Sequence, residues 1–150
     1  MTRVIRVGRA ATVLEVARGA KPTRAKPRHL EHDAQVAFFK RVDNDPRTRD
    51  LLVYAVPNAG GYSGGYKSNA ARASRMKAEG VRRGPPDINI DEPREDWHGM
   101  RIEMKIGKNR QTPEQAEWAH RLDARGYYVI TCYSAADAWS FLMRYLGFTP

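Results

Sequence analysis

Cysteine and long apolar runs are nearly absent from this chain. Only one cysteine, Cys132, stands among the 150 residues, which excludes an internal disulfide and a cysteine-rich zinc site. We therefore expect a reducing, cytoplasmic setting. No apolar run approaches the roughly 20 residues that a membrane helix needs, and none near Met1 has the form of a secretory signal. No membrane association is expected, and the length fits a single domain with one moderate core.

Acidic residues are scarce at the start of the chain. Residues 1–29 hold eight of the 26 Lys and Arg but only one acidic residue, Glu15. The remaining residues hold 18 basic and 16 acidic side chains, so most of the formal charge of +9 lies in the first 29 residues. Such an arm adds sequence-independent affinity for nucleic acid, although its composition also suits a solubilising tail or a transit peptide. We predict a basic arm or linker over residues 1–29 and a folded domain over residues 30–150.

Helical and strand patterns alternate after residue 29. Apolar residues at helical spacing predict helices over residues 30–44, 69–78, 113–124 and 134–145, with Gly80 expected to cap the second of them. Strands are expected over residues 51–56, 84–90, 101–106 and 127–133, and the polar stretch 91–99 is typical of a β-hairpin connection between the middle two. Helices interleaved with strands indicate an α/β sheet with covered faces.

Three charged residues lie in the two strands of this hairpin. Glu103 and Lys105 are two residues apart and therefore point to the same face of their strand, and an antiparallel neighbour could bring Asp87 beside them. Two carboxylates and one ammonium on one sheet face form a plausible site for Mg²⁺ and a phosphate group. The same residues would also fit a solvated aspartate and a cross-strand Glu–Lys surface pair.

These residues belong to an ordered set of five segments, which makes the pattern specific. The segments with their flanks are Tyr54-Ala55-Val56-Pro57-Asn58-Ala59-Gly60-Gly61, Val81-Arg82-Arg83-Gly84 directly before Pro85-Pro86-Asp87, Ile102-Glu103-Met104-Lys105 with a Gly/Lys-rich turn after it, and Thr112-Pro113-Glu114-Gln115. In this order they resemble the VRR-NUC branch of the PD-(D/E)XK nuclease superfamily. The resemblance covers roughly residues 30 to 135.

The resemblance implies a fold and a metal site. The fold would be a restriction-endonuclease-like αβββαβ core, with a mixed central sheet flanked by helices. Asp87, Glu103 and the backbone carbonyl of Met104 would hold Mg²⁺ or Mn²⁺. Lys105, which cannot bind a metal as an ammonium, would orient the attacking water or stabilise charge on the phosphate.

Two more residues enter the site through the resemblance. The branch carries a glutamate on its first helix, and Glu31 with the following Gln35 matches best, with Asp33 on a different helical face as its competitor. Gln115 would contact a metal-bound water or phosphate. An ordinary solvated carboxylate near a helix N-terminus and an exposed helical glutamine are the alternatives for Glu31 and Gln115.

A glycine-rich loop and a basic helix follow the first expected strand. The loop lacks the G-x-x-x-x-G-K-[ST] spacing of a nucleotide-binding loop, so we expect it to contact DNA instead. The aromatic rings of this region could stack on bases, and its cations could bind phosphates. The alternative is that the cations are simply the solvated side chains of an exposed helix. The residues expected to contact DNA are Asn58, Tyr62, Tyr66, Lys67, Arg72, Arg75, Arg82 and Arg83.

Together these features predict a metal-dependent, structure-selective endodeoxyribonuclease. The resemblance further implies a phage or bacterial protein that resolves branched DNA, such as a Holliday junction or a flap, as a homodimer. A non-catalytic DNA-binding module that retains the nuclease fold is the alternative, and it would bind DNA without metal-dependent cleavage. A structural protein with a basic tail would show no preference for branched over linear DNA.

Overall fold

The computed structural model describes residues 27–56 and 66–149. These residues form four helices and four strands in the order α1 (Pro27–Asn44), β1 (Val53–Ala55), α2 (Tyr66–Ala78), β2 (Ile88–Ile90), β3 (Gly99–Met104), α3 (Pro113–Asp123), β4 (Tyr127–Cys132) and α4 (Ala135–Tyr145). The strands form one sheet in the order β1-β2-β3-β4. The first two pairings are antiparallel and the β3–β4 pairing is parallel. The expected mixed α/β architecture is therefore confirmed.

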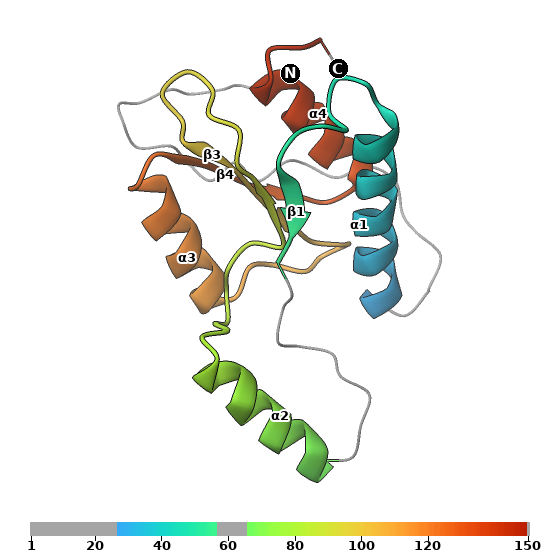
Figure 1. Ribbon diagram of the computed structural model, residues 1–150. Helices are drawn as coiled ribbons and strands as arrows, with labels where there is room; N and C mark the ends of the chain where they lie inside the picture. Colours follow the sequence, from blue (N-terminus) through green and yellow to red (C-terminus); the bar gives the residue numbers. More distant parts are fainter. Residues whose placement is uncertain (1–26, 57–65, 150) are drawn as a thin grey trace.

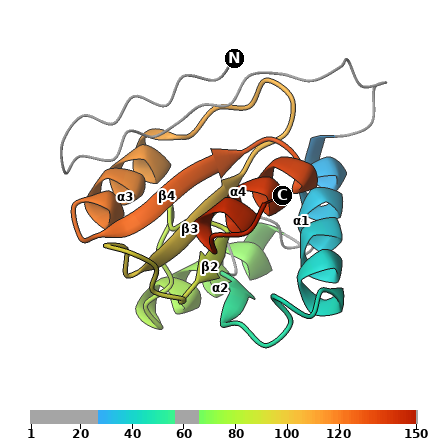
Figure 2. The same cartoon turned by 90° about the horizontal axis from the view of Figure 1, so that it is seen from above.

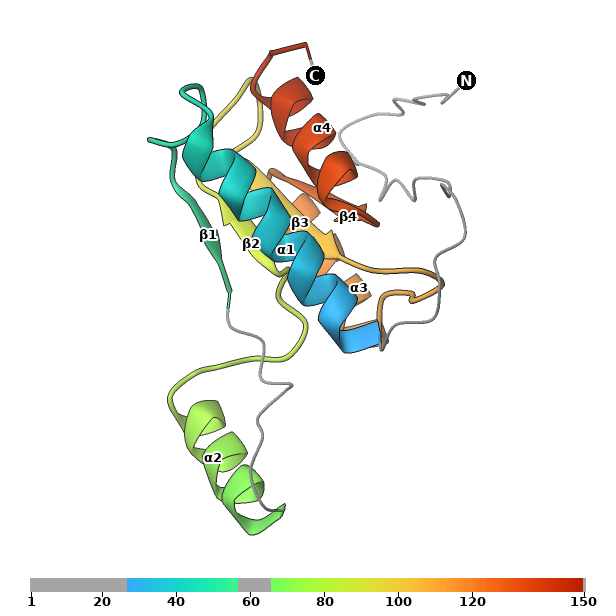
Figure 3. The same ribbon diagram turned by 90° about the vertical axis from the view of Figure 1, so that its right-hand side faces the viewer.

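The helices cover the two faces of the sheet unequally. Helices α1 and α4 pack against each other on one face, and α3 lies on the opposite face (Figures 2 and 3). Helix α3 also provides the crossover that two parallel strands need. Among the described residues, two helices thus cover one face of the sheet and α3 covers the other.

The hydrophobic core fills the space between the sheet and the α1–α4 pair. Successive side chains of a strand point to opposite faces, so every second residue of β2, β3 and β4 enters this core. The strand contributions are Ile88, Ile90, Met100, Ile102, Met104, Ile130 and Cys132, and the helices add Phe38, Val42, Ala138, Trp139, Leu142 and Met143. The intervening residues of β3, among them Glu103, consequently face α3.

Several element boundaries differ from those expected. Helix α1 begins at Pro27, inside the segment expected to be an arm or linker, and α2 begins three residues earlier than predicted. Strand β2 is only three residues long, because Pro85 and Pro86 have no N–H groups with which to extend the ladder. Asp87 therefore lies just before the strand. Lys105 lies just after β3, although its N–H still donates to the Cys132 carbonyl at 2.9 Å.

Helix α2 stands apart from the sheet and from the other helices (Figures 1 and 3). Its C-terminus is closed locally, because Gly80 takes a φ of +96° and Val81 donates its N–H to the Met76 carbonyl at 2.9 Å. The expected Gly80 cap is therefore present. The segment after α2 leads directly to Asp87, so α2 projects from the end of the sheet at which Asp87 lies (Figure 1). Among the described residues, no helix combines the length and the apolar character needed to cross a membrane.

Candidate active site

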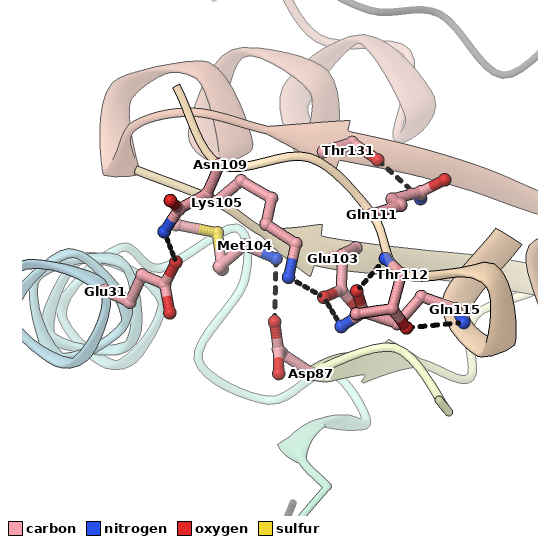
Figure 4. A network of polar contacts seen from close by, with 10 residues as sticks. All are labelled: Glu31, Asp87, Glu103, Met104, Lys105, Asn109, Gln111, Thr112, Gln115 and Thr131. Atoms are coloured by element: carbon pink, nitrogen blue, oxygen red, sulfur yellow. Dashed lines mark hydrogen bonds and ion pairs between the residues drawn. The ribbon is translucent and has the colours of Figure 1, made fainter. Parts of the chain in front are cut away.

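Asp87 is fixed beside the end of β3 by a backbone hydrogen bond. Its Oδ2 atom accepts from the Met104 N–H at 2.8 Å (Figure 4). If the register of β2 with β3 continued, Pro86 would stand opposite Met104. The Asp87 carboxylate thus takes the Met104 N–H just beyond the end of the regular β2–β3 ladder. The N–H and C=O of one strand residue point to the same side, so the Met104 carbonyl is expected on the β2 side of β3.

Glu103 and Lys105 form a buried ion pair on the α3 side of the sheet. Their side chains are only 2% and 11% exposed, and the Lys105 Nζ atom lies 2.8 Å from the Glu103 Oε1 atom. The amide nitrogen of Gln115, on α3, donates to the same oxygen (Figure 4). Two donors from different elements therefore hold one oxygen of a single carboxylate.

The negative charge on Glu103 is unfavourable where it lies. Burial, and after it the nearby negative charge of Asp87, raise the pKa of Glu103 from its ordinary 4.5 to about 7. The hydrogen bond and positive charge of Lys105 act in the opposite direction, while Glu31 adds a smaller upward contribution to the pKa. One ammonium thus does not fully compensate the carboxylates, which is the electrostatic condition that favours an additional cation.

Gln115 lies in the first turn of α3, where it takes part in the helix cap. Thr112 is the N-cap residue and Pro113 follows it, as the sequence predicts. The Thr112 Oγ1 atom accepts from the Gln115 N–H at 3.3 Å, and the Gln115 Oε1 atom accepts from the Thr112 N–H at 2.9 Å. This reciprocal pair is a capping box, and it brings the Gln115 side chain to Glu103.

Glu31 meets a residue of the loop that follows Lys105. Its Oε1 atom accepts from the Asn109 side-chain amide at 3.1 Å, which connects the start of α1 to this loop. Further along the loop, Gln111 donates to the Thr131 hydroxyl of β4 at 2.8 Å. Sequence reasoning missed Asn109, Gln111 and Thr131 as partners. The sequence shows that a Gly/Lys-rich turn follows Lys105, but it does not show which distant residues this loop contacts.

A structural comparison identifies the architecture. No protein-family model matches the sequence, and no curated protein matches it. A solved structure described as "VRR_NUC domain protein" matches this chain with a TM-score of 0.65 and 25% sequence identity, over 80% of this chain and 90% of that chain. The chain has a VRR-NUC nuclease fold. The resemblance drawn from the sequence motifs is therefore confirmed at the level of the backbone.

The VRR-NUC fold implies a divalent metal ion, and its donor set can be tested on this chain. Within the described residues, no three His, Cys, Asp or Glu side chains gather closely enough to hold a metal ion. Asp87 lies close enough to Glu103 to raise its pKa, and the Asp87 carboxylate accepts the Met104 N–H. Mg²⁺ is commonly held by one or two carboxylates, with water and substrate phosphate completing its shell, so this set fits. Glu31 as a metal ligand stays a prediction.

The residues expected to bind DNA are only partly described. Asn58 and Tyr62 lie outside the described residues, and for Tyr66 and Lys67 only the backbone, in the first turn of α2, is described. Arg72, Arg75, Arg82 and Arg83 are exposed on α2 and on the segment that leads to Asp87.

Several exposed cations lie at this end of the molecule, and Arg83 lies near Glu114. Arg75 pairs with Glu79 at 2.9 Å, in an exposed bridge that contributes little to stability. Lys108 and Arg110, in the loop after Lys105, are two exposed cations that sequence reasoning missed. They flank Asn109, whose contact with Glu31 ties the loop to α1.

Proposed function

We propose that this chain is a Mg²⁺- or Mn²⁺-dependent endodeoxyribonuclease. The observation that supports this most is the buried Glu103–Lys105 pair beside Asp87, at one end of the sheet of a VRR-NUC fold. A buried ion pair is poor evidence for a stabilising role, because desolvation of both charges offsets their attraction. Its position therefore points to chemistry at that end of the sheet.

The proposed roles follow from the contacts of each side chain. Asp87, Glu103 and the Met104 carbonyl would hold the metal ion, and Glu31 would add a carboxylate from α1. A bound divalent ion would polarise the scissile phosphate and make a water molecule more acidic. The Lys105 ammonium, held by Glu103, would place its positive charge where negative charge develops on the phosphate.

DNA is the proposed substrate, because exposed cations surround this end of the molecule. Arg82 and Arg83 precede Asp87 on one side, and Lys108 and Arg110 follow Lys105 on the other. Contacts from such residues to phosphates give affinity without base specificity. We further propose that DNA shape selects the substrate, and that branched DNA is cut by a homodimer on opposing strands. The resemblance to VRR-NUC nucleases is the support for the dimer.

The test is a cleavage assay on labelled DNA of several shapes. Holliday-junction, flap, splayed-arm and linear substrates would be incubated with Mg²⁺, Mn²⁺ or EDTA. We expect metal-dependent cleavage of one branched class, and its loss in Glu103→Gln and Lys105→Met proteins that still bind DNA. Glu117→Gln, which removes an exposed carboxylate from α3, is the matched control and should cleave normally. Salt-sensitive binding with no cleavage in any metal would instead identify a non-catalytic DNA-binding module.

A further inference from the structure

The amide of Gln115 is used at both of its ends. Its Oε1 atom accepts the Thr112 N–H at 2.9 Å, which closes the capping box of α3. Its Nε2 atom donates to Glu103 Oε1, the oxygen that Lys105 also contacts. The cap of a helix and the carboxylate of a strand are thus connected through one side chain.

This double use defines the direction of the amide. If the amide were turned over, its oxygen would face the Glu103 carboxylate and its NH₂ would face the Thr112 N–H, so both contacts would be repulsive. The Thr112 N–H therefore determines that Nε2 points toward Glu103. Glutamate is an equally good third residue in a capping box, but here it would place a second carboxylate against Glu103.

The two donors on Glu103 reach the same oxygen. Lys105 and Gln115 both contact Oε1 of the Glu103 carboxylate. Rotation of the Glu103 carboxylate would break both contacts. Two contacts from the chain therefore hold the same carboxylate oxygen in place.

We propose that the α3 capping box positions Glu103 for metal binding, with Thr112 as the positioning residue that acts through Gln115. The proposal rests on the proposed metal-dependent function. Thr112 is exposed and does not contact Glu103, so its effect on the metal must pass through the Gln115 amide. Partners that orient a metal ligand typically change metal affinity by 10- to 100-fold when they are removed.

A matched pair of helix caps separates positioning from stability. Thr112→Ala keeps the Thr112 N–H but removes the hydroxyl that accepts the Gln115 N–H, so the first turn of α3 no longer holds the Gln115 side chain over that N–H. Thr112→Ser retains the hydroxyl. Ser134→Ala removes the corresponding hydroxyl from α4, where the Asp137 N–H donates to Ser134 Oγ at 3.0 Å. Both alanine variants should lose a similar amount of helix-capping stability. Only one of the two caps is connected to Glu103.

The first measurement is NMR of the metal-free protein, which does not depend on activity. The Gln115 side-chain NH₂ resonance, assigned by its loss in Gln115→Met, should be shifted downfield and slow to exchange, because it donates to a carboxylate. Thr112→Ala should return it toward the position of an exposed glutamine, while Thr112→Ser and Ser134→Ala leave it in place. An unchanged resonance in Thr112→Ala would overturn the proposal.

The second measurement is Mn²⁺ affinity by calorimetry without DNA. We expect a loss of 10- to 100-fold in Gln115→Met, about tenfold in Thr112→Ala, and less than twofold in Thr112→Ser and Ser134→Ala. Equal losses of Mn²⁺ affinity in Thr112→Ala and Ser134→Ala would mean that lower stability causes the loss, and would overturn the positioning role. If the wild-type protein binds no Mn²⁺ and cuts no DNA, the proposed function fails. In that case the NMR result still decides whether the cap orients Gln115 toward Glu103.

Discussion

The Lys105 ammonium lies 2.8 Å from Glu103 in a pair that is almost fully buried. The attraction between these charges does not fully offset the cost of burying the charged Glu103 carboxylate. Burial and the charge of Asp87 still raise the pKa of this carboxyl to about 7. The metal-free site is therefore a place where the fold holds more negative charge than it can readily accommodate. This relationship leads to predictions for stability, metal binding and DNA binding.

The first prediction concerns the stability of the metal-free protein as a function of pH. The folded pKa of Glu103, about 7, lies above its ordinary value of 4.5, so folding favours the protonated form. The resulting stabilisation is present below pH 4.5 and is lost as the pH rises through 7. A glutamine at this position does not titrate, so Glu103→Gln does not lose this stabilisation. The stability of Glu103→Gln relative to wild type should therefore increase by roughly 2 to 3 kcal/mol as the pH rises from 5 to 8.

Urea unfolding in EDTA at both pH values measures this difference. Glu117→Gln, at an exposed position on α3, should show a difference from wild type that is the same at pH 5 and pH 8. A Glu103→Gln difference that is equally flat with pH would contradict the prediction.

A second prediction separates the charge of Asp87 from its hydrogen bond. In Asp87→Asn, the amide oxygen can still accept from the Met104 N–H, so stability should remain near that of wild type while Mn²⁺ affinity falls at least tenfold. Asp87→Ala should lose the same affinity and, in addition, about 1 to 3 kcal/mol of stability, because the Met104 N–H loses its acceptor. Calorimetry and urea unfolding measure the two effects, and equal stabilities of the two variants would contradict the role of the hydrogen bond.

The third prediction concerns the loop after Lys105. If Lys108 and Arg110 contact phosphates, Lys108→Gln/Arg110→Gln should weaken DNA binding and reduce the slope of log affinity against log salt by about 2. The measurement uses fluorescence anisotropy in a Glu103→Gln background, in which DNA is not cut.

The control removes two cations from the opposite end of α3. Arg121 and Arg125 are exposed near the C-terminus of this helix, whereas its N-terminus lies at Glu103. Arg121→Gln/Arg125→Gln carries the same change in net charge and should leave the salt slope nearly unchanged. Equal reductions in both double variants would mean that net charge, and not the loop, determines the affinity.

Local patterns in the sequence predicted much of the fold and part of the site. Strand alternation placed Glu103 and Lys105 on one face, and turn residues predicted the antiparallel pairing of β2 with β3, which the structure confirms. Thr112 and Pro113 marked the start of α3. These features depend on the two- and 3.6-residue periods of strands and helices and on capping chemistry, all of which a single sequence contains.

The remaining features depend on tertiary packing. Asn109 reaches Glu31 across 78 residues, and Gln111 reaches Thr131 across 20, so neither partner has a local signal. The projection of α2 was equally hidden, because its sequence predicts a helix but not that the helix stands away from the sheet. The use of Gln115 as both a cap and a Glu103 partner needed the placement of α3 against β3.

The last prediction concerns the close approach of the segment before Asp87 to α3. Gly84 has a φ of +95°, and a Cβ atom there would lie 2.7 Å from the Glu114 carbonyl oxygen and 2.6 Å from Trp118 Cδ1. Gly80 has nearly the same φ, +96°, but a Cβ atom there would meet nothing within 4 Å. Both alanine substitutions therefore bear the strain of a left-handed backbone, about 1 to 2 kcal/mol, and only Gly84→Ala adds a clash with backbone.

Gly84→Ala should consequently lower the urea midpoint clearly more than Gly80→Ala does. Because the clash pushes the segment that carries Asp87 away from the helix that carries Gln115, Mn²⁺ affinity should also fall in Gly84→Ala and remain unchanged in Gly80→Ala. Similar unfolding midpoints and similar Mn²⁺ affinities in the two variants would mean that the segment can move away from α3 without cost, and that its packing there does not position Asp87.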